Sequence, residues 1–514
     1  MRTSNSIKNS FTSFILSIIT MLLGFVAQAI FIRILGAEYS GLNGLFTNVL
    51  TMLSFFELGI GNAIVFHLYK PIAINDEEEI KTLMKFYEKA YNIISVLVLA
   101  CGLAIIPFLN IIVGEISIDI NIYVIYIMFL LNTSISYTLS YRRNLIIANQ
   151  KNYIINIIHI IYIIILNLSQ LLVLYLTKNY YLYLGIKIIC QILENFVCYI
   201  IAGKLYPFIT SKNVKPLDKN LKDDIFKKVK ALLFHKVGYS VVSGTDNIII
   251  SSFLGVVTVG FYTNYNMVIT AVNNLFSQII GSTSASVGNL LATQSNYNKK
   301  YNVFKKIRFI NFWLASFSGI CILVMMDSFI HLWVGEKYIL PLIVLVTLVV
   351  NYYQKLMRNC YGTFKDSAGI WYEDRFVPLV EAILNIVFSI ILLKIFGLAG
   401  VFMGTIISGL SLWCYSYPKY VYKKLFNRMY KDYAKETIGY LVLFVLIAIF
   451  TFFISRLIVF DNIWLQFLSN TIISLIVPNL ILLIIFRKTD NFQYLLQIVK
   501  KTFGKIKKRI GTTS

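Results

Sequence analysis

A few ionisable residues lie within long apolar stretches of this sequence, where charge is costly and usually serves binding or transport. Lys187 and Glu194 are two helical turns apart, so they share one face of a helix. A cation held inside a membrane could bind a phosphate or another anion, which makes Lys187 the most informative residue. The acidic members of the set could line a polar cavity or couple transport to an ion: Glu57, Glu194, Asp246 and Glu381.

Further basic residues are candidates for binding an anion, namely Arg33, Arg142, Arg143 and Lys236. They fall near the ends of apolar stretches, from where a long side chain reaches the lipid headgroups, so anchoring is their alternative role. For Lys187 the alternative is an ion pair with Glu194 or Glu57. His159 stands alone in an isoleucine-rich stretch, where a buried histidine with one satisfied hydrogen bond is commoner than a proton relay.

The chain carries no sequence signature of an enzyme. A GxxxxGK[ST] phosphate loop, an HExxH motif, a GxSxG motif and paired metal-ligand spacings are all missing from it. The six cysteines lie within or at the ends of apolar stretches and form no CxxC pair, so we interpret them as small core residues. We therefore expect no catalytic residue, no metal and no cofactor.

The elements that must position these residues are membrane helices. About 20 apolar residues span a bilayer core as a helix, and hydrophobic residues make up 58% of this chain, with a mean hydropathy of +0.72. We predict an all-α integral membrane protein with fourteen transmembrane helices. They are expected at 10–33, 43–69, 87–110, 120–141, 153–176, 180–203, 231–254, 262–291, 307–331, 338–357, 377–396, 398–421, 438–458 and 463–486.

Lysine and arginine are distributed unevenly between the gaps that separate these stretches. If the N-terminus is cytoplasmic, 41 of the 47 fall on the cytoplasmic side, and only Lys187 lies inside a span. This is a strong positive-inside pattern, which predicts a cytoplasmic membrane protein with both termini in the cytoplasm. The net charge of +23 then reflects topology and anionic headgroups, so we expect membrane lipids and not nucleic acid as partners.

An internal repeat divides the chain after its longest polar segment, 204–230. Glycine pairs recur at a common offset of 219 residues: Gly36 with Gly255, Gly41 with Gly260, and Gly185 with Gly404. Such an offset predicts two six-helix lobes of the same orientation, a known transporter plan. The expected domains are an N-terminal lobe, a cytoplasmic linker, a C-terminal lobe, two further transmembrane helices and a tail, at 1–203, 204–230, 231–422, 438–486 and 487–514.

Two segments outside the spans are expected to be amphipathic helices. In the first, 75–89, Asn75 and Asp76 are candidate caps for an acidic first turn, and we interpret the segment as an interfacial helix that leads into the third span. In the second, 491–510, apolar residues alternate with basic ones. We expect this tail to lie on the inner leaflet.

The chain resembles bacterial polysaccharide repeat-unit flippases of the Wzx type, which belong to the superfamily of multidrug, oligosaccharidyl-lipid and polysaccharide exporters. The segments that carry the resemblance are FIRILGAEYSGLNGLFTNVL at 31–50, FFELGIGNAI at 55–64, DNIIISSFLGVVTVGFYTNYNMV at 246–268 and VPLVEAILNIVFSIILLKIFGLAGVFMGTIIS at 377–408. The resemblance implies two pseudo-symmetric, MATE-like lobes around a cavity that opens alternately to either side. It also implies transfer of an oligosaccharide on undecaprenyl diphosphate from the inner to the outer leaflet.

In related lipid flippases basic cavity residues contact the diphosphate, and the last two spans can form a lipid groove. By resemblance Arg33 is a candidate for such contact, although the chain lacks a dense arginine cluster in mid-span. Partners implied are a polysaccharide polymerase and glycosyltransferases. The main alternative is an ion-coupled exporter of drugs or small solutes with the same fold, which would favour carboxylates over a cation in its cavity. A membrane-embedded transferase is the third, but the external gaps are short.

Overall fold

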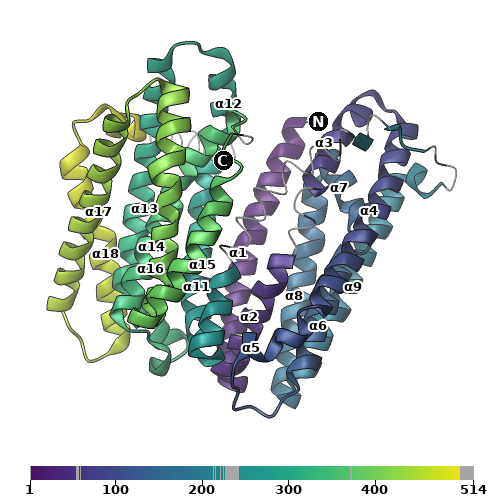
Figure 1. The fold of residues 1–514 in the computed structure, drawn as a ribbon, viewed down its shortest axis with the longest axis horizontal. Coiled ribbons are helices and arrows are strands. Elements are labelled where there is room, and N and C mark those ends of the chain that lie inside the picture. The colour runs from purple at the N-terminus through teal and green to yellow at the C-terminus, as the bar shows by residue number, and fades with distance from the viewer. Residues whose placement is uncertain are drawn as a thin grey trace, which may run out of the picture. The chain divides into compact units, whose positions relative to one another are not determined.

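The structure is a computed structural model that describes residues 2–53, 57, 60–211, 214, 216–219, 222–223, 225, 242, 244–370 and 373–497. The regular elements in these ranges are helices, as the sequence predicts. The chain forms two compact units, Met1–Thr263 and Asn264–Ser514. Each unit is a bundle of long helices that lie side by side (Figure 1). The domain boundaries expected from the sequence stay a prediction.

The first unit is built from helices of very different lengths. In chain order they are α1 (Arg2–Leu35), α2 (Ala37–Leu53), α3 (Ile60–Ile74), α4 (Glu77–Leu103), α5 (Leu109–Val113), α6 (Ile122–Tyr137), α7 (Tyr141–Ala148), α8 (Asn152–Thr177) and α9 (Tyr180–Leu205). Residues 244–254 are also helical. Within this unit α8 packs between α1 and α9, and α9 packs on α6.

The second unit contains the longest helix of the described chain. Its elements are α11 (Val256–Gly281), which starts in the first unit, α12 (Ser284–Thr293), α13 (Tyr297–Trp333), α14 (Leu342–Ser367), α15 (Val377–Phe396), α16 (Leu398–Ser411), a π-helical segment η5 (Leu412–Leu425), α17 (Tyr430–Leu457) and α18 (Ile463–Phe486). Here α13 packs on α14, α17 and α18, and α15 packs along α16.

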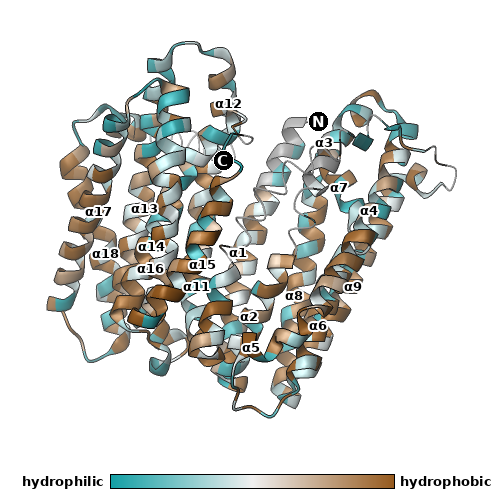
Figure 2. Ribbon diagram, in the orientation of Figure 1, coloured by the Kyte–Doolittle hydropathy of each residue, from teal (hydrophilic) through white to brown (hydrophobic). Residues whose placement is uncertain are grey.

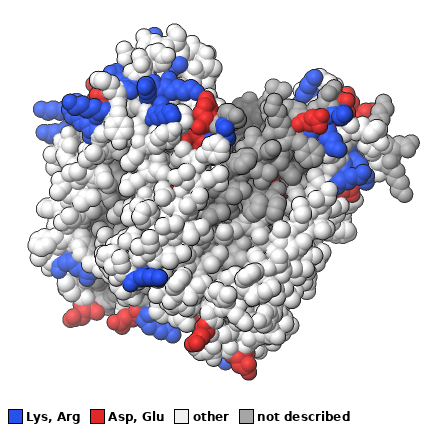
Figure 3. All heavy atoms as spheres, viewed as in Figure 1, with Lys and Arg blue, Asp and Glu red and all other residues white. Residues whose placement is uncertain are grey.

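The surfaces of both units suit a lipid environment. Large apolar side chains are exposed along α8, α9, α17 and α18, and apolar residues run along the lengths of the helices (Figure 2). The charged side chains visible in Figure 3 gather at the helix ends. In the described part of the chain nine helices are long and apolar enough to cross a membrane, or ten if α6 and α7 form one broken span. The chain is therefore a multi-pass membrane protein.

The predicted count of fourteen spans stays a prediction. The expected spans 43–69 and 231–254 fall partly outside the described residues. The former contains two helices, α2 and α3, and not one continuous helix. The expected span 120–141 is also broken, because α6 ends at Tyr137 and α7 continues at an angle of 43°. Hydropathy alone misses such breaks, since it averages over the residues where the backbone turns.

The N-terminal half of α4 corrects one local prediction and confirms another. The expected interfacial helix at 75–89 is not separate, because α4 runs without interruption from Glu77 to Leu103. Asp76 caps it as predicted, with its side chain accepting a hydrogen bond from the backbone N–H of Glu79 at 2.9 Å. The apolar residues of this first part are buried, which draws it into the bundle: Ile80, Leu83, Met84 and Tyr87.

The described start of the C-terminal tail packs on protein. Phe492 is buried and stacks on Trp313 of α13, with ring centroids 5.5 Å apart. The expectation of a helix lying wholly on the inner leaflet is therefore wrong for this part. Residues 498–514, which carry most of its basic residues, lie outside the described residues.

The turn positions of the two halves agree in backbone conformation at the predicted offset. Positive φ angles occur at three pairs of residues separated by 219 positions: Gly36 and Gly255, Gln150 and Gly369, and Lys178 and Gly397. Left-handed conformations are uncommon outside glycine, so their recurrence at one offset is informative. Gly185 and Gly404 differ, since a Cβ at Gly185 would meet nothing while one at Gly404 would strike Ser389.

Two helices approach closely at the second glycine pair, with both contact points inside the first unit. A Cβ added at Gly41 of α2 would overlap the carbonyl oxygen of Val256, and one at Gly260 of α11 would overlap that of Ala37. The contacts are reciprocal, because Ala37 and Val256 are themselves 219 residues apart. The absence of a side chain at both glycines lets the two backbones touch, as in small-residue contacts between membrane helices.

We expect Gly41→Ala to destabilise the protein by about 1–3 kcal/mol, because an extra methyl group in a tight contact forces the backbones apart. Gly185→Ala is the matched control, since it adds the same methyl group where no neighbour is met. It should be neutral or stabilising by roughly 0.5–1 kcal/mol, as expected for glycine replaced within a helix. The thermal unfolding midpoint of the purified protein in detergent compares the two. Equal midpoints would refute the close contact.

Candidate functional site

A polar pocket surrounds Lys187 inside the first unit. Its volume is about 200 Å³, and residues from α2, α6 and α9 line it: Thr47, Leu50, Thr51, Phe129, Asn132, Thr133, Tyr137 and Lys187. The Lys187 ammonium lies 5.2 Å from the centre of the Phe129 ring. Neither a carboxylate nor a hydrogen-bond acceptor pairs with it among the described residues. The pocket therefore holds a cation that is not neutralised.

The sequence explains why the walls of this pocket are polar. Thr47 and Thr51 are one turn apart on α2, so both face the same side. On α6, Asn132 and Thr133 precede the break at Tyr137, and the Asn132 side-chain oxygen is buried without a hydrogen-bond partner. An ammonium group, hydroxyls and an amide together can bind an oxyanion or a hydroxylated group.

A second polar cluster on α9 faces the opposite neighbours, α7 and α8. The Glu194 side chain is only 2% exposed, and one of its carboxylate oxygens lies 2.8 Å from His159 Nδ1. Its other oxygen lies 3.2 Å from Arg143 and accepts a hydrogen bond from Gln191 at 3.2 Å. The predicted alternative of an ion pair between Lys187 and Glu194 is therefore wrong, because Glu194 is already neutralised by Arg143.

The break between α6 and α7 is what brings Arg143 to Glu194. Ending α6 leaves backbone carbonyl groups without helical partners, and the Asn195 amide donates to those of Ile135 and Thr138, each at 2.9 Å. The Asn195 oxygen accepts a hydrogen bond from Arg143 at 2.8 Å. Asn195 thus fixes both the break and the arginine, a role that sequence spacing does not reveal.

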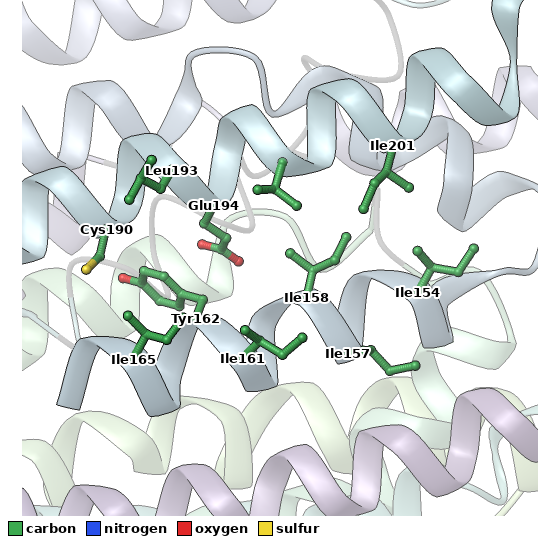
Figure 4. Close-up of a pocket in the computed structure, with 11 residues that line it drawn as sticks. Ile154, Ile157, Ile158, Ile161, Tyr162, Ile165, Cys190, Leu193, Glu194 and Ile201 are labelled. Atoms are coloured by element: carbon green, nitrogen blue, oxygen red, sulfur yellow. The ribbon is translucent and has the colours of Figure 1, made fainter. Parts of the chain in front are cut away.

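An apolar groove runs beside this cluster between α8 and α9. Its volume is about 350 Å³, and its lining is mostly isoleucine: Ile154, Ile157, Ile158, Ile161, Tyr162, Ile165, Cys190, Leu193, Glu194, Val197 and Ile201. Figure 4 shows the Glu194 carboxylate pointing from α9 toward α8, close to the Tyr162 ring. The Tyr162 ring also stacks on His159, with centroids 5.4 Å apart.

The other candidate cations are not gathered around the Lys187 pocket. Arg33 is exposed in the last turn of α1. Arg142 is buried by packing, with its guanidinium 3.5 Å from the centre of the Tyr199 ring. Lys236 lies outside the described residues. The structure therefore brings together only Arg143 and Glu194 of the predicted set.

The remaining candidate carboxylates have different surroundings. Glu57 accepts a hydrogen bond from the Tyr91 hydroxyl at 3.3 Å, and Asn144 donates to that hydroxyl at 3.0 Å. Asp246 is buried in the helix at 244–254. In the second unit Glu381 lies 2.7 Å from Arg358, so this pair is neutral.

The sequence analysis missed the most enclosed ion pair of the second unit. Arg308 of α13 has a side chain only 3% exposed and lies 2.5 Å from Glu436 of α17. Hydroxyl groups of Tyr301 and Tyr422 also contact this pair, and the Tyr440 ring lies 5.0 Å from the guanidinium. In the sequence both charges fall in cytoplasmic gaps, where they look like topology signals. The pair fastens α17 to α13.

Comparisons with known proteins agree with this architecture. The family described as polysaccharide biosynthesis protein matches residues 6–284. No curated protein sequence matches the chain. Among solved structures, the lipid II flippase MurJ in an inward closed conformation is 15% identical with a TM-score of 0.69, over 94% of this chain and 99% of that one.

Two transporter structures are also similar. An inward-facing multidrug resistance MATE family transporter of the MOP superfamily is 14% identical with a TM-score of 0.59, over 76% of this chain and 91% of that one. A variant of the MATE transporter VcmN from Vibrio cholerae is 12% identical with a TM-score of 0.56, over 83% and 99%. At such identities the likeness establishes the fold.

Removing one partner of the Arg308 pair should expose its structural role. We expect Glu436→Gln to destabilise the second unit by about 3 kcal/mol, because it leaves the buried guanidinium without a counter-charge. Asp432→Asn is the matched control, since this acid lies one turn earlier on α17. Thermal unfolding in detergent measures both variants. A Glu436→Gln protein as stable as the Asp432→Asn protein would contradict the role assigned to the pair.

Proposed function

Because the chain belongs to the polysaccharide biosynthesis protein family, we propose that it is a flippase for lipid-linked oligosaccharides. In this proposal it moves a repeat unit on undecaprenyl diphosphate from the inner to the outer leaflet of the cytoplasmic membrane, by alternating access. The product then serves the synthesis of a surface polysaccharide. The fold shared with a lipid II flippase and with MATE transporters supports transport rather than catalysis.

The Lys187 pocket is the observation that carries the proposal. A diphosphate with sugars attached cannot enter hydrocarbon unaided, since a charge there costs several kcal/mol. The pocket offers an unneutralised ammonium group beside hydroxyl and amide groups, which can replace part of the headgroup's hydration. The prenyl chain can stay in lipid while the headgroup passes through protein.

The charge of this pocket also separates the proposal from its main alternative. An exporter of organic cations would need a free carboxylate in its binding site. In the first unit, Glu194 is instead neutralised by Arg143 and bonded to His159, and the unneutralised group of the pocket is a cation. An anionic substrate therefore fits this unit better than a cationic drug.

The proposal includes the finer architecture. We infer two six-helix lobes at 1–203 and 231–422, a linker at 204–230, and two additional helices at 438–486. The three pairs of positive φ angles at an offset of 219 residues support this repeat. The positive-inside pattern supports cytoplasmic termini. Lipid-linked oligosaccharide and membrane lipids are the expected partners, with a polymerase and glycosyltransferases acting after and before export.

We expect Lys187→Ala to lower the rate of export of lipid-linked oligosaccharide by at least tenfold, because a charge-assisted hydrogen bond to phosphate contributes about 1.5–3 kcal/mol. Lys187→Arg should retain part of the activity, since it keeps the charge. The measurement is the appearance of lipid-linked oligosaccharide in the outer leaflet of proteoliposomes that contain the purified protein.

Lys178→Ala is the control for this experiment, because Lys178 lies just before α9 but outside the pocket. It should export at the wild-type rate. Wild-type export by Lys187→Ala would overturn the role of the pocket in binding the diphosphate, whereas no export by the wild-type protein would overturn the proposed function itself.

A further inference from the structure

The hydrogen bond between His159 and Glu194 fixes which nitrogen of His159 is free. An ionised carboxylate only accepts hydrogen bonds, so His159 Nδ1, 2.8 Å from Glu194, carries the hydrogen. Nε2 is then the basic nitrogen of the ring, and no partner for it occurs among the described residues. The His159 side chain is 37% exposed while that of Glu194 is 2% exposed, so a proton can reach the ring but not the carboxylate.

The net charge of this cluster depends on one proton. Arg143 is always charged, and it neutralises Glu194 at 3.2 Å. With a neutral His159 the cluster therefore has no net charge, and with a protonated His159 its charge is +1. Histidine is the side chain whose charge ordinarily changes between pH 5 and 8. The cluster is thus built to gain or lose one positive charge within a membrane-spanning unit.

No other charged group near His159 can compensate for that change. On its own helix the stacked neighbour is Tyr162. On α9 the titratable groups are Glu194, Cys190 and Cys198, and on α7 the facing charge is Arg143, since Arg142 turns toward Tyr199. The helix α1, which packs on α8, has no ionisable side chain between Lys8 and Arg33, apart from none facing this site, and α6 contributes no charged residue.

The cluster and the Lys187 pocket share one rigid element, α9. Seven residues separate Lys187 from Glu194, which is about 10 Å along a helix. A unit charge at that distance changes the affinity for another charge by on the order of tenfold when the effective dielectric constant is about 20. The added charge therefore reaches the pocket without any conformational change.

We propose that His159 Nε2 is a proton-binding site, and that its protonation strengthens binding of the anionic headgroup in the Lys187 pocket. The second part rests on the proposed function. Linkage makes the effect reciprocal, so a bound diphosphate also favours the proton at His159. The site thus couples the proton concentration on the accessible side of the membrane to the loading of the substrate.

Export by proteoliposomes at pH 5.5 and pH 7.5 tests the coupling. For the wild-type protein at low substrate concentration we expect export to be about tenfold faster at pH 5.5. His159→Gln keeps a donor for Glu194 but cannot take up the proton, so its rate should stay low at both values. His331→Gln, in the last turn of α13, is the control and should keep the wild-type dependence on pH.

A second variant gives the opposite result at pH 7.5. Glu194→Gln removes the negative charge, so the cluster holds the charge of Arg143 even when His159 is neutral. Its rate at pH 7.5 should therefore approach the wild-type rate at pH 5.5. Wild-type dependence on pH in both His159→Gln and Glu194→Gln would overturn the proposal while leaving the proposed function intact.

Hydrogen exchange measures the proton site without any transport. Protonation turns the hydrogen bond to Glu194 into a charge-assisted one, which is stronger. Amides of α8 and α9 around the pair should therefore be several-fold more protected at pH 5.5 than at pH 7.5, after correction for intrinsic exchange, and only when His159 is present. Equal protection in the wild-type and His159→Gln proteins would overturn the proton site. If the wild-type protein exports nothing, the coupling falls with the proposed function and this measurement alone decides the proton site.

Discussion

Hydrocarbon offers no hydrogen bonds, so polar groups in membrane helices must find their partners within the protein. Much of this structure follows from that constraint. Where α6 breaks before α7, the freed carbonyl groups are satisfied by Asn195. Where Arg308 is enclosed by the second unit, Glu436 and two tyrosine hydroxyls surround it. Among the described residues considered for binding, Lys187 departs from this pattern, and that departure marks it as functional rather than structural.

Features that depend on local sequence could be predicted, because they require only neighbours along the chain. Asp76 was expected as a helix cap and is one, and the last span ends at Phe486 as the hydropathy pattern indicates. Lys187 was selected from its place in an apolar stretch, and the structure places it in a polar pocket. The all-helical membrane fold follows from composition and charge asymmetry in the same way.

Features that depend on tertiary contacts could not be predicted. Spacing on one helix paired Lys187 with Glu194, but the partners of Glu194 come from α7 and α8, and only the break after Tyr137 brings Arg143 within reach. Arg308 and Glu436 are 128 residues apart and were hidden among charges that report topology. The glycine offset predicted a repeat, but not that Gly41 and Gly260 would bring two backbones into contact.

The charges of the first unit suit a substrate that must be released as well as bound. Several fixed cations around a diphosphate would hold it tightly, since each charge-assisted hydrogen bond adds to the affinity. Such a site would bind the headgroup equally well before and after translocation and would slow its release. The first unit instead combines one fixed cation, Lys187, with a neighbouring cluster that is neutral unless His159 takes up a proton. An affinity that can be raised and lowered on a single helix meets the needs of a carrier better than a permanently strong site.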